Sequence, residues 1–212
     1  MTLLDVHRAA VDLFSRRGYE ATGIRELGAA AGVNSATLYH YAGGKQELLA
    51  EVMRLCLDEL LDRGRIAQAS SEIPTAQLAA LIASHVGISA LNPRTALVTD
   101  QEMRSLTEKR REVLTDVRDE YETLFTTVLA RGAKDGSFDV SDVVLTRLAL
   151  LEMCNGVAHW YRPGGRLGVQ DVQRRFVEFG TRLVGAQGSE PWTGRLLEAR
   201  VLDIEPRVAV SA

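Results

Sequence analysis

Apolar side chains recur every three or four residues along most of this chain, and this spacing restricts its fold more than any other feature. The first such stripe consists of Leu3, Val6, Ala10, Leu13 and Phe14. A longer stripe runs through residues 107–134. The interval is that of an amphipathic α-helix. Aromatic residues make up only 6% of the chain and prolines number five, a composition that favours helices over sheets. We therefore predict an all-α fold.

The order of the helical segments predicts two domains and a tail. Residues 1–46 hold three short helices in the arrangement of a helix-turn-helix domain, and residues 47–185 hold the longer helices of a bundle. The short helices are predicted at 3–17, 22–31 and 35–41, with Thr22 as the N-cap of the second. Residues 186–212 contain two prolines and no sustained period. They are predicted to form an extended or partly disordered tail.

The chain lacks sequence features that are typical of membrane proteins, cysteine metal or redox sites, and enzymes. No apolar run approaches the roughly 18 residues that cross a bilayer, which predicts a cytoplasmic protein without membrane contact. Cys56 and Cys154 lie far apart in helical patterns and are predicted to be reduced and buried. The chain has no Gly-rich phosphate loop, Glu-x-x-His pair or Ser/His/Asp signature. We accordingly predict no catalytic residue, no metal, no cofactor and no enzyme activity.

The charge of the chain limits how it can bind nucleic acid. The formal net charge is −3 and the isoelectric point is about 5.9, which argues against a general nucleic-acid coat. Residues 1–54 contain six basic and six acidic residues, so their formal charge is zero. Affinity for DNA must therefore come from the placement of individual side chains.

The stretch GVNSATLYHYAGGKQELL, residues 32–49, carries aromatic and hydroxyl side chains on a short helix. Leu38 is predicted to anchor this helix in the core. Side chains three or four residues apart share a face, which projects small, hydroxyl and tyrosine side chains outward. Small residues allow close approach to base edges, and hydroxyl groups can bond to phosphates. The alternative is that Tyr39 and Tyr41 are ordinary core or surface aromatics.

The segment FSRRGYEATGIRELGAAAGVNSATLYHYAGGKQELL resembles the N-terminal domain of the tetracycline-repressor (TetR) family of bacterial transcription regulators. The resemblance covers about residues 3–55. It implies base, backbone and thymine-methyl contacts from the third helix, a base or phosphate contact from Arg25 of the second helix, and phosphate contacts from Thr22 and Lys45. The implied DNA-contacting residues are Thr22, Arg25, Asn34, Ser35, Ala36, Thr37, Tyr39, His40, Tyr41 and Lys45. Two residues depart from the family pattern: Ala42 stands where phenylalanine is usual, and Gly28 where alanine is usual.

The same resemblance implies a C-terminal bundle that binds an effector and dimerises through its last two helices, here about 142–161 and 168–185. The first of these, VVLTRLALLEMCNGVAHWY, is apolar on almost every side. Such a helix must be covered on both faces, and a second subunit can cover one of them. The alternative is a central core helix of a monomer.

Three short stretches, QEMRSL, RDEYETLF and HWYRPGGRL, resemble TetR-family repressors of fatty-acid and steroid degradation, some of which respond to acyl-CoA thioesters. Such a ligand needs an apolar tunnel with basic residues at its mouth. The implied tunnel residues are Met103, Tyr121, Phe125, Met153 and Trp160, and the implied basic residues are Arg104, Arg118 and Arg162. In the alternative interpretation the apolar residues are core, the arginines are solvated or paired with Glu102, Asp119 or Glu122, and RPGG only ends a helix.

The sequence thus predicts a homodimeric repressor that binds palindromic double-stranded operator DNA. A small hydrophobic effector, with acyl-CoA as the suspected class, is predicted to release it. A regulator of drug efflux that responds to lipophilic compounds is the alternative within the same family. An interaction module without DNA binding is a further alternative, but it leaves the pattern of residues 32–49 unexplained.

Overall fold

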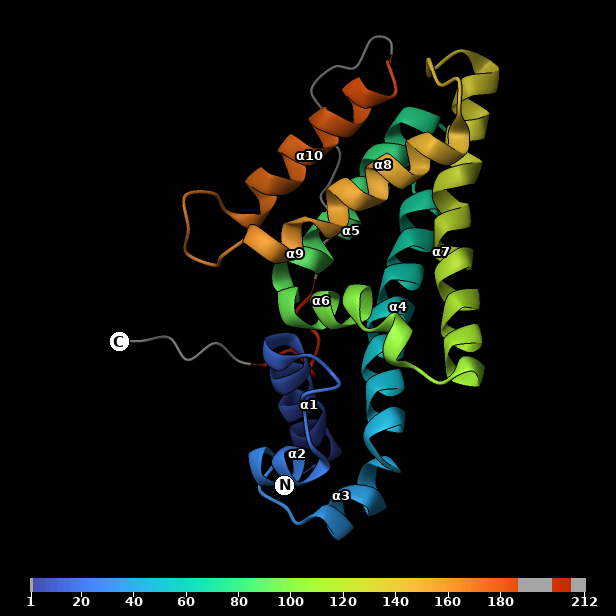
Figure 1. The fold of residues 1–212 in the computed structure, drawn as a ribbon. Coiled ribbons are helices and arrows are strands. Elements are labelled where there is room, and N and C mark those ends of the chain that lie inside the picture. The colour runs from blue at the N-terminus through green and yellow to red at the C-terminus, as the bar shows by residue number, and fades with distance from the viewer. Residues whose placement is uncertain (1, 187–199, 207–212) are drawn as a thin grey trace. The chain divides into compact units, whose positions relative to one another are not determined.

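The computed structural model describes residues 2–186 and 200–206, with the backbone alone at Tyr41. Helices connected by short turns make up the described residues, and none of them forms a strand (Figure 1). The helices are α1 (Leu3–Arg17), α2 (Ile24–Ala30), α3 (Ser35–Ala42), α4 (Lys45–Ala69), α5 (Pro74–Leu91), α6 (Pro93–Gln101), the 3-10 turn η1 (Met103–Ser105), α7 (Glu108–Asp135), α8 (Val143–Asn155), α9 (Val157–Trp160) and α10 (Val169–Leu183). The predicted all-α class is confirmed for this part of the chain.

The chain divides into two compact units, and each is built from segments that are distant in sequence. The head unit contains residues 1–57, 92–115 and 201–212; the bundle unit contains residues 58–91 and 116–200. Packing therefore groups α6 and the start of α7 with the N-terminal helices. The predicted domain boundary at residue 46 divides the chain only by sequence position and does not include this grouping. Of the predicted tail, residues 187–199 and 207–212 lie outside the described residues.

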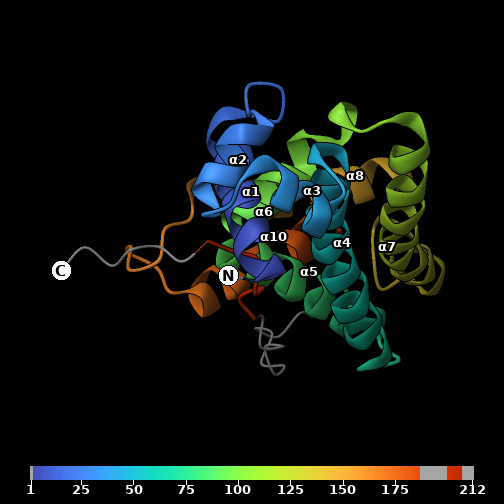
Figure 2. The same ribbon diagram turned by 90° about the horizontal axis from the view of Figure 1, so that it is seen from below.

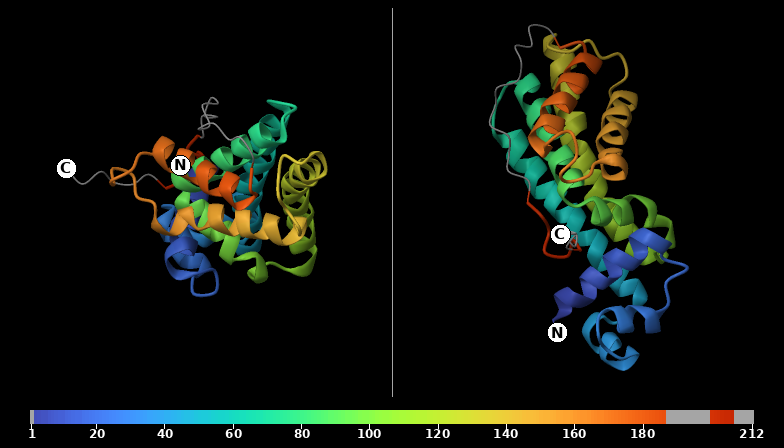
Figure 3. Two further views of the ribbon diagram at one scale, coloured as in Figure 1. Left: turned by 90° about the horizontal axis from the view of Figure 1, so that it is seen from above. Right: turned by 90° about the vertical axis from the view of Figure 1, so that its left-hand side faces the viewer.

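Helix ends in the head unit follow from local hydrogen bonding. The Thr2 hydroxyl accepts a hydrogen bond from the Asp5 amide, and the Asp5 carboxylate accepts one from the Thr2 amide, which makes a capping box for α1. Gly18 ends α1 with a φ of +82°. Helix α6 packs against α1 (Figure 3). Between the two helices, Nη1 of Arg94 lies 2.6 Å from Oδ1 of Asp12.

The turn between α2 and α3 explains one departure from the family pattern. A Cβ atom added to Gly28 would lie 2.7 Å from the carbonyl oxygen of Val33. The Val33 amide also donates a hydrogen bond to the Gly28 carbonyl oxygen, at 2.7 Å. The two backbones are therefore too close for any larger residue at position 28 without movement. The other departure, Ala42, is buried at the end of α3.

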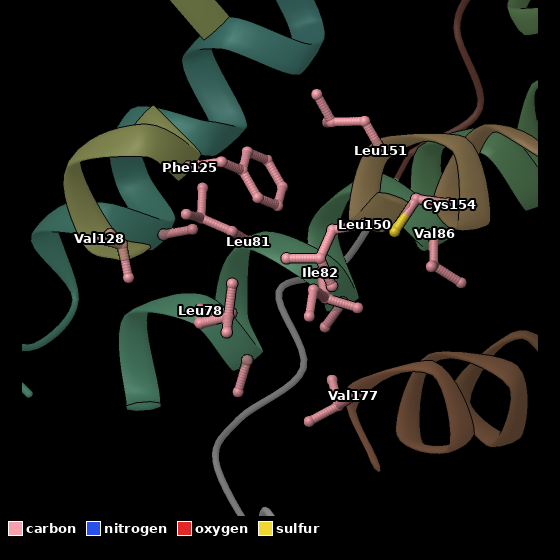
Figure 4. Packing of buried hydrophobic residues seen from close by; sticks show 14 of the residues in the cluster. Leu78, Leu81, Ile82, Val86, Phe125, Val128, Leu150, Leu151, Cys154 and Val177 are labelled. Carbon is pink, nitrogen blue, oxygen red and sulfur yellow. The ribbon is translucent and has the colours of Figure 1, made fainter. Parts of the chain in front are cut away.

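The core of the bundle unit surrounds α5. Leu78, Leu81, Ile82 and Val86 of α5 contact side chains from α7, α8 and α10 (Figure 4). Helix α5 is the one described helix with the length and composition of a membrane span, because the 18 residues Pro74–Leu91 have moderate hydropathy and include no Asp, Glu, Lys or Arg. The expectation that no run approaches this length is corrected here. Of that helix, 83% is buried inside the protein, as expected of a core helix.

The helix predicted at about 142–161 is divided in two. Helix α8 ends at Asn155, a turn follows at Gly156, and α9 ends at Trp160. Glycine is a poor helix former because it loses much backbone freedom when it becomes helical. The spacing of apolar residues gives no information about this effect. Cys56 and Cys154 are both buried, as predicted.

Candidate nucleic-acid interface

Helix α3 is anchored by one buried leucine and presents its other side to solvent. Leu38 is fully buried, which confirms the predicted anchor. Ala36 and His40 are exposed, Tyr39 is 53% exposed, and Ser35 and Thr37 are partly exposed. Figure 2, which views the structure from below, shows this helix beside α1 and α2. The Tyr41 side chain, predicted to face DNA, lies outside the described residues.

Both ends of α3 are fixed by short-range hydrogen bonds. Oδ1 of Asn34 accepts a hydrogen bond from the Thr37 amide at 2.8 Å, so Asn34 is the N-cap. The Asn34 side-chain oxygen is therefore already bonded within the protein. Gly43 ends the helix in the left-handed region with a φ of +69°, and its amide donates to the Tyr39 carbonyl at 2.9 Å. The helix is therefore held in a defined orientation before any DNA is bound.

The remaining residues implied by the family resemblance have different environments. Arg25 is exposed on α2. Thr22 is 1% exposed and its hydroxyl donates to the Gly18 carbonyl at 2.8 Å; the N-cap of α2 is Gly23. The predicted N-cap role of Thr22 is therefore wrong, and its hydroxyl is buried and bonded within the protein. Nζ of Lys45 lies 3.8 Å from the centre of the Tyr19 ring, a cation–π contact that orients the ammonium group.

Two acidic residues near this surface are neutralised by arginines. Glu26 of α2 forms an ion pair with Arg17, and Glu47 in the first turn of α4 forms one with Arg110 of α7. An unpaired carboxylate here would repel DNA phosphates. Pairing with an arginine reduces this repulsion at both positions.

A polar cluster that the sequence analysis missed connects α4 to the segment between α6 and α7. Nε2 of Gln46 donates to the Tyr19 hydroxyl at 2.6 Å and to the Ser105 carbonyl at 2.7 Å, while its Oε1 accepts from the Thr107 amide at 3.0 Å. Oε1 of Glu102 accepts from the Tyr19 amide at 2.9 Å. Burial raises the pKa of Tyr19 above its ordinary value near 10. These contacts hold the start of α4, and so the end of α3, in place.

Three of the four implied tunnel residues in the bundle unit share one buried cluster. Tyr121 and Phe125 are buried on α7 with ring centroids 5.7 Å apart, and Met153 of α8 packs against the same cluster. The Tyr121 hydroxyl lies 2.9 Å from Nδ1 of His85, and Nε2 of His85 lies 2.8 Å from Oδ1 of Asn155. Because an amide oxygen only accepts, Nε2 donates and Nδ1 accepts from the tyrosine. This buried polar chain also escaped the sequence analysis.

The other implied effector residues are not gathered with these three. Arg118 lies 3.5 Å from a Glu122 oxygen, the paired state that the alternative interpretation expects. Arg162 is exposed and donates to the Tyr161 carbonyl. Trp160 is 50% exposed and stacks on Phe176, with ring centroids 6.0 Å apart. Two further residues of the set belong to the head unit: Met103, which is buried, and Arg104, which is exposed.

Helix α3 is capped, faces outward and follows the helix α2 that packs against it. This is the geometry of a helix-turn-helix DNA-binding protein. The family described as "Bacterial regulatory proteins, tetR family" matches residues 7–52, and the "Tetracyclin repressor-like, C-terminal domain" matches residues 71–184. The chain belongs to the TetR family of transcription regulators.

Individual relatives agree with this assignment. The HTH-type transcriptional repressor KstR2 of Rhodococcus jostii is 34% identical over 82% of this chain and 85% of its own length. The solved structure of the ketosteroid transcriptional regulator KstR2 of Mycobacterium tuberculosis has a TM-score of 0.78 at 26% identity, over 87% of this chain and 94% of the other. The structure of AibR in complex with isovaleryl coenzyme A and operator DNA has a TM-score of 0.73 over 85% and 97% of the two chains, at 20% identity.

Proposed function

We propose that this chain is a cytoplasmic transcriptional repressor that binds palindromic double-stranded operator DNA as a homodimer. We propose further that a small hydrophobic effector of the acyl-CoA class releases it from that DNA. The observation that carries the proposal is the exposed face of α3, in a chain that is 34% identical to a named repressor. Regulation of lipid or steroid breakdown is the proposed role.

The proposed DNA contacts follow from exposure. Ser35, Ala36 and Thr37 stand at the N-terminal end of α3, where small side chains let the backbone approach base edges. Tyr39, His40 and Tyr41 follow on the same short helix, and Arg25, Asn34 and Lys45 flank it. The flanking residues suit phosphate contacts, which set the position of the helix but carry no sequence information.

The proposed dimer is supported by apolar side chains that the bundle unit leaves exposed. Val144, Leu145 and Leu148 of α8 and Phe179 and Leu183 of α10 are between 44% and 64% exposed. Phe179 also contacts Phe176, the ring on which Trp160 stacks. A second copy that covers these helices would bury the exposed side chains by a self-complementary contact. Two α3 helices could then enter successive major grooves about one turn of DNA apart.

The proposed effector class is supported by two observations. AibR, whose structure contains isovaleryl coenzyme A, shares the fold of this chain. The buried apolar cluster around Tyr121 and Phe125 contains the polar His85 chain, and an effector domain of this kind combines apolar surface with a few oriented polar groups. Coupling between the two sites is reciprocal, so an effector that weakens DNA binding is itself bound more weakly by the DNA complex.

A titration of the DNA complex tests this proposal. A duplex is first selected from a random pool by the native protein, and release is then followed by fluorescence anisotropy as acyl-CoA thioesters, free fatty acids or lipophilic cations are added. Release by thioesters alone supports the proposal. Release by lipophilic cations alone favours the regulator of drug efflux. Failure to select any duplex refutes operator binding.

Variants of the bundle unit refine the same titration. Arg162→Ala removes an exposed cation proposed for the thioester head group, and Arg166→Ala is the matched control in the same loop. The proposal expects Arg162→Ala to require more thioester for half release, with unchanged affinity for DNA in the absence of effector. Equal release curves for the two variants remove Arg162 from the proposed site.

A further inference from the structure

The chain after the bundle returns to the head unit as a short irregular segment. Residues 201–206 belong to the head unit, and Leu202, Ile204 and Glu205 are each at most 7% exposed. The segment is drawn in dark red beside α1 in Figure 1. It lies beyond residue 184, where the matched family segments end. We call residues 201–206 the clasp.

The clasp bonds to α6 at the end where that helix lacks a cap of its own. The side chain of Asn92, the N-cap residue of α6, makes no capping bond; its Oδ1 accepts from the Leu202 amide at 2.5 Å. Oε1 of Glu205 accepts from the Arg94 amide at 3.1 Å, and Oε2 accepts from the Thr95 amide at 3.0 Å and the Thr95 hydroxyl at 2.6 Å. A carboxylate at this position also interacts favourably with the helix dipole.

The clasp also bonds to α1. Nε of Arg8 donates to the Asp203 carbonyl oxygen at 2.8 Å. The Arg94 side chain, next to the amide that Glu205 accepts, pairs with Asp12 of α1. The clasp and Arg94 therefore join the same two helices, α1 of the DNA-binding head and α6.

We infer that Glu205 is a positioning residue for DNA binding, because it caps α6 and thereby fixes α6 against α1. The inference rests on the proposed operator binding. Both carboxylate oxygens face N–H or O–H donors, so an amide cannot replace the carboxylate: its NH₂ group would face a donor. Burial raises the pKa of Glu205, and the bonds to Thr95 and Arg94 oppose that rise.

The test compares Glu205→Gln with Asp203→Asn in the full-length protein. Both variants replace one acidic side chain of the clasp by its amide, but the Asp203 side chain is exposed and only its backbone carbonyl holds Arg8. Hydrogen exchange of residues 92–101 reports on the cap of α6. Affinity is measured for a duplex selected by the native protein and for a random duplex.

We expect Glu205→Gln to increase exchange in residues 92–101 and to weaken binding of the selected duplex by up to about tenfold, the limit reached if the whole free energy of a lost helix cap is taken from binding. Binding of random DNA should change much less, whereas a smaller folded fraction would weaken both alike. Asp203→Asn should match the native protein in every measurement. Unchanged exchange in Glu205→Gln, or increased exchange with unchanged affinity for the selected duplex, overturns the inference. If the native protein selects no duplex, operator binding fails, and the exchange data still decide whether Glu205 caps α6.

Discussion

His85 provides a quantitative test of the buried polar chain in the bundle unit. Its imidazole is fully buried between Tyr121 and Asn155, and burial lowers the pKa of His85 from 6.5 to about 4. The unfolded chain then binds a proton at a higher pH than the native protein. Stability from the neutral imidazole is present above pH 6.5 and is lost as the pH falls toward the native pKa.

The size of the effect follows from the difference between the two pKa values. A gap of about 2.5, at about 1.4 kcal/mol per pKa unit, corresponds to about 3 kcal/mol lost from the free energy of unfolding by pH 4. This loss is measured by urea unfolding, followed by circular dichroism, at pH values from about 7.5 to about 4 in steps of roughly half a unit. Carboxylates also titrate in this range, so a difference between variants is required.

His85→Gln removes the titrating group, and His159→Gln removes an exposed histidine of the same unit as a matched control. The pH slopes are compared, so a change in absolute stability does not disturb the result. We expect the slope of His85→Gln to be shallower than that of the native protein by the stated amount, and the slope of His159→Gln to be unchanged. Equal slopes for the native protein and His85→Gln would refute the burial of a neutral imidazole.

Three further substitutions test the head and the dimer. Gly28→Ala should destabilise the fold by about 1–3 kcal/mol in thermal unfolding, because the added Cβ would lie 2.7 Å from the Val33 carbonyl oxygen. This cost should exceed the gain of about 1 kcal/mol in helix propensity. An increase in melting temperature would contradict this prediction. Lys45→Ala should lower the salt dependence of DNA binding by about one charge per subunit, and an unchanged slope would leave Lys45 with only its contact to Tyr19. Phe179→Glu should produce monomers in sedimentation velocity, because it places a charge on the exposed apolar face; a retained dimer would exclude that face.

Helix positions and the anchor of α3 could be predicted because the interval between apolar residues records which side of a helix is buried. Leu38 follows from that rule alone. The break at Gly156 does not, since apolar residues continue in register on both sides of it. The same rule fails for α5, where Ser84, His85 and Ser89 are buried among apolar neighbours.

Contacts between distant segments could not be predicted, because a polar side chain carries no mark of its partner. Gln46 has the sequence context of an ordinary residue in the first turn of a helix, yet it bonds to Ser105 and Thr107. Glu205 lies in a stretch without any period, which favoured the prediction of a tail. Its role as a cap depends on donors more than 100 residues earlier in the chain.

The central claim is that α3 reads DNA sequence, and its most direct test is the affinity of Thr37→Ala and Tyr39→Ala for a selected and a random duplex. Both side chains are at least partly exposed, so the variants should keep the native circular dichroism spectrum. We predict a loss of about tenfold or more for the selected duplex, at about 1–3 kcal/mol per base contact, and little change for random DNA. Native affinity of both variants for the selected duplex would contradict the assignment of α3 as the reading helix.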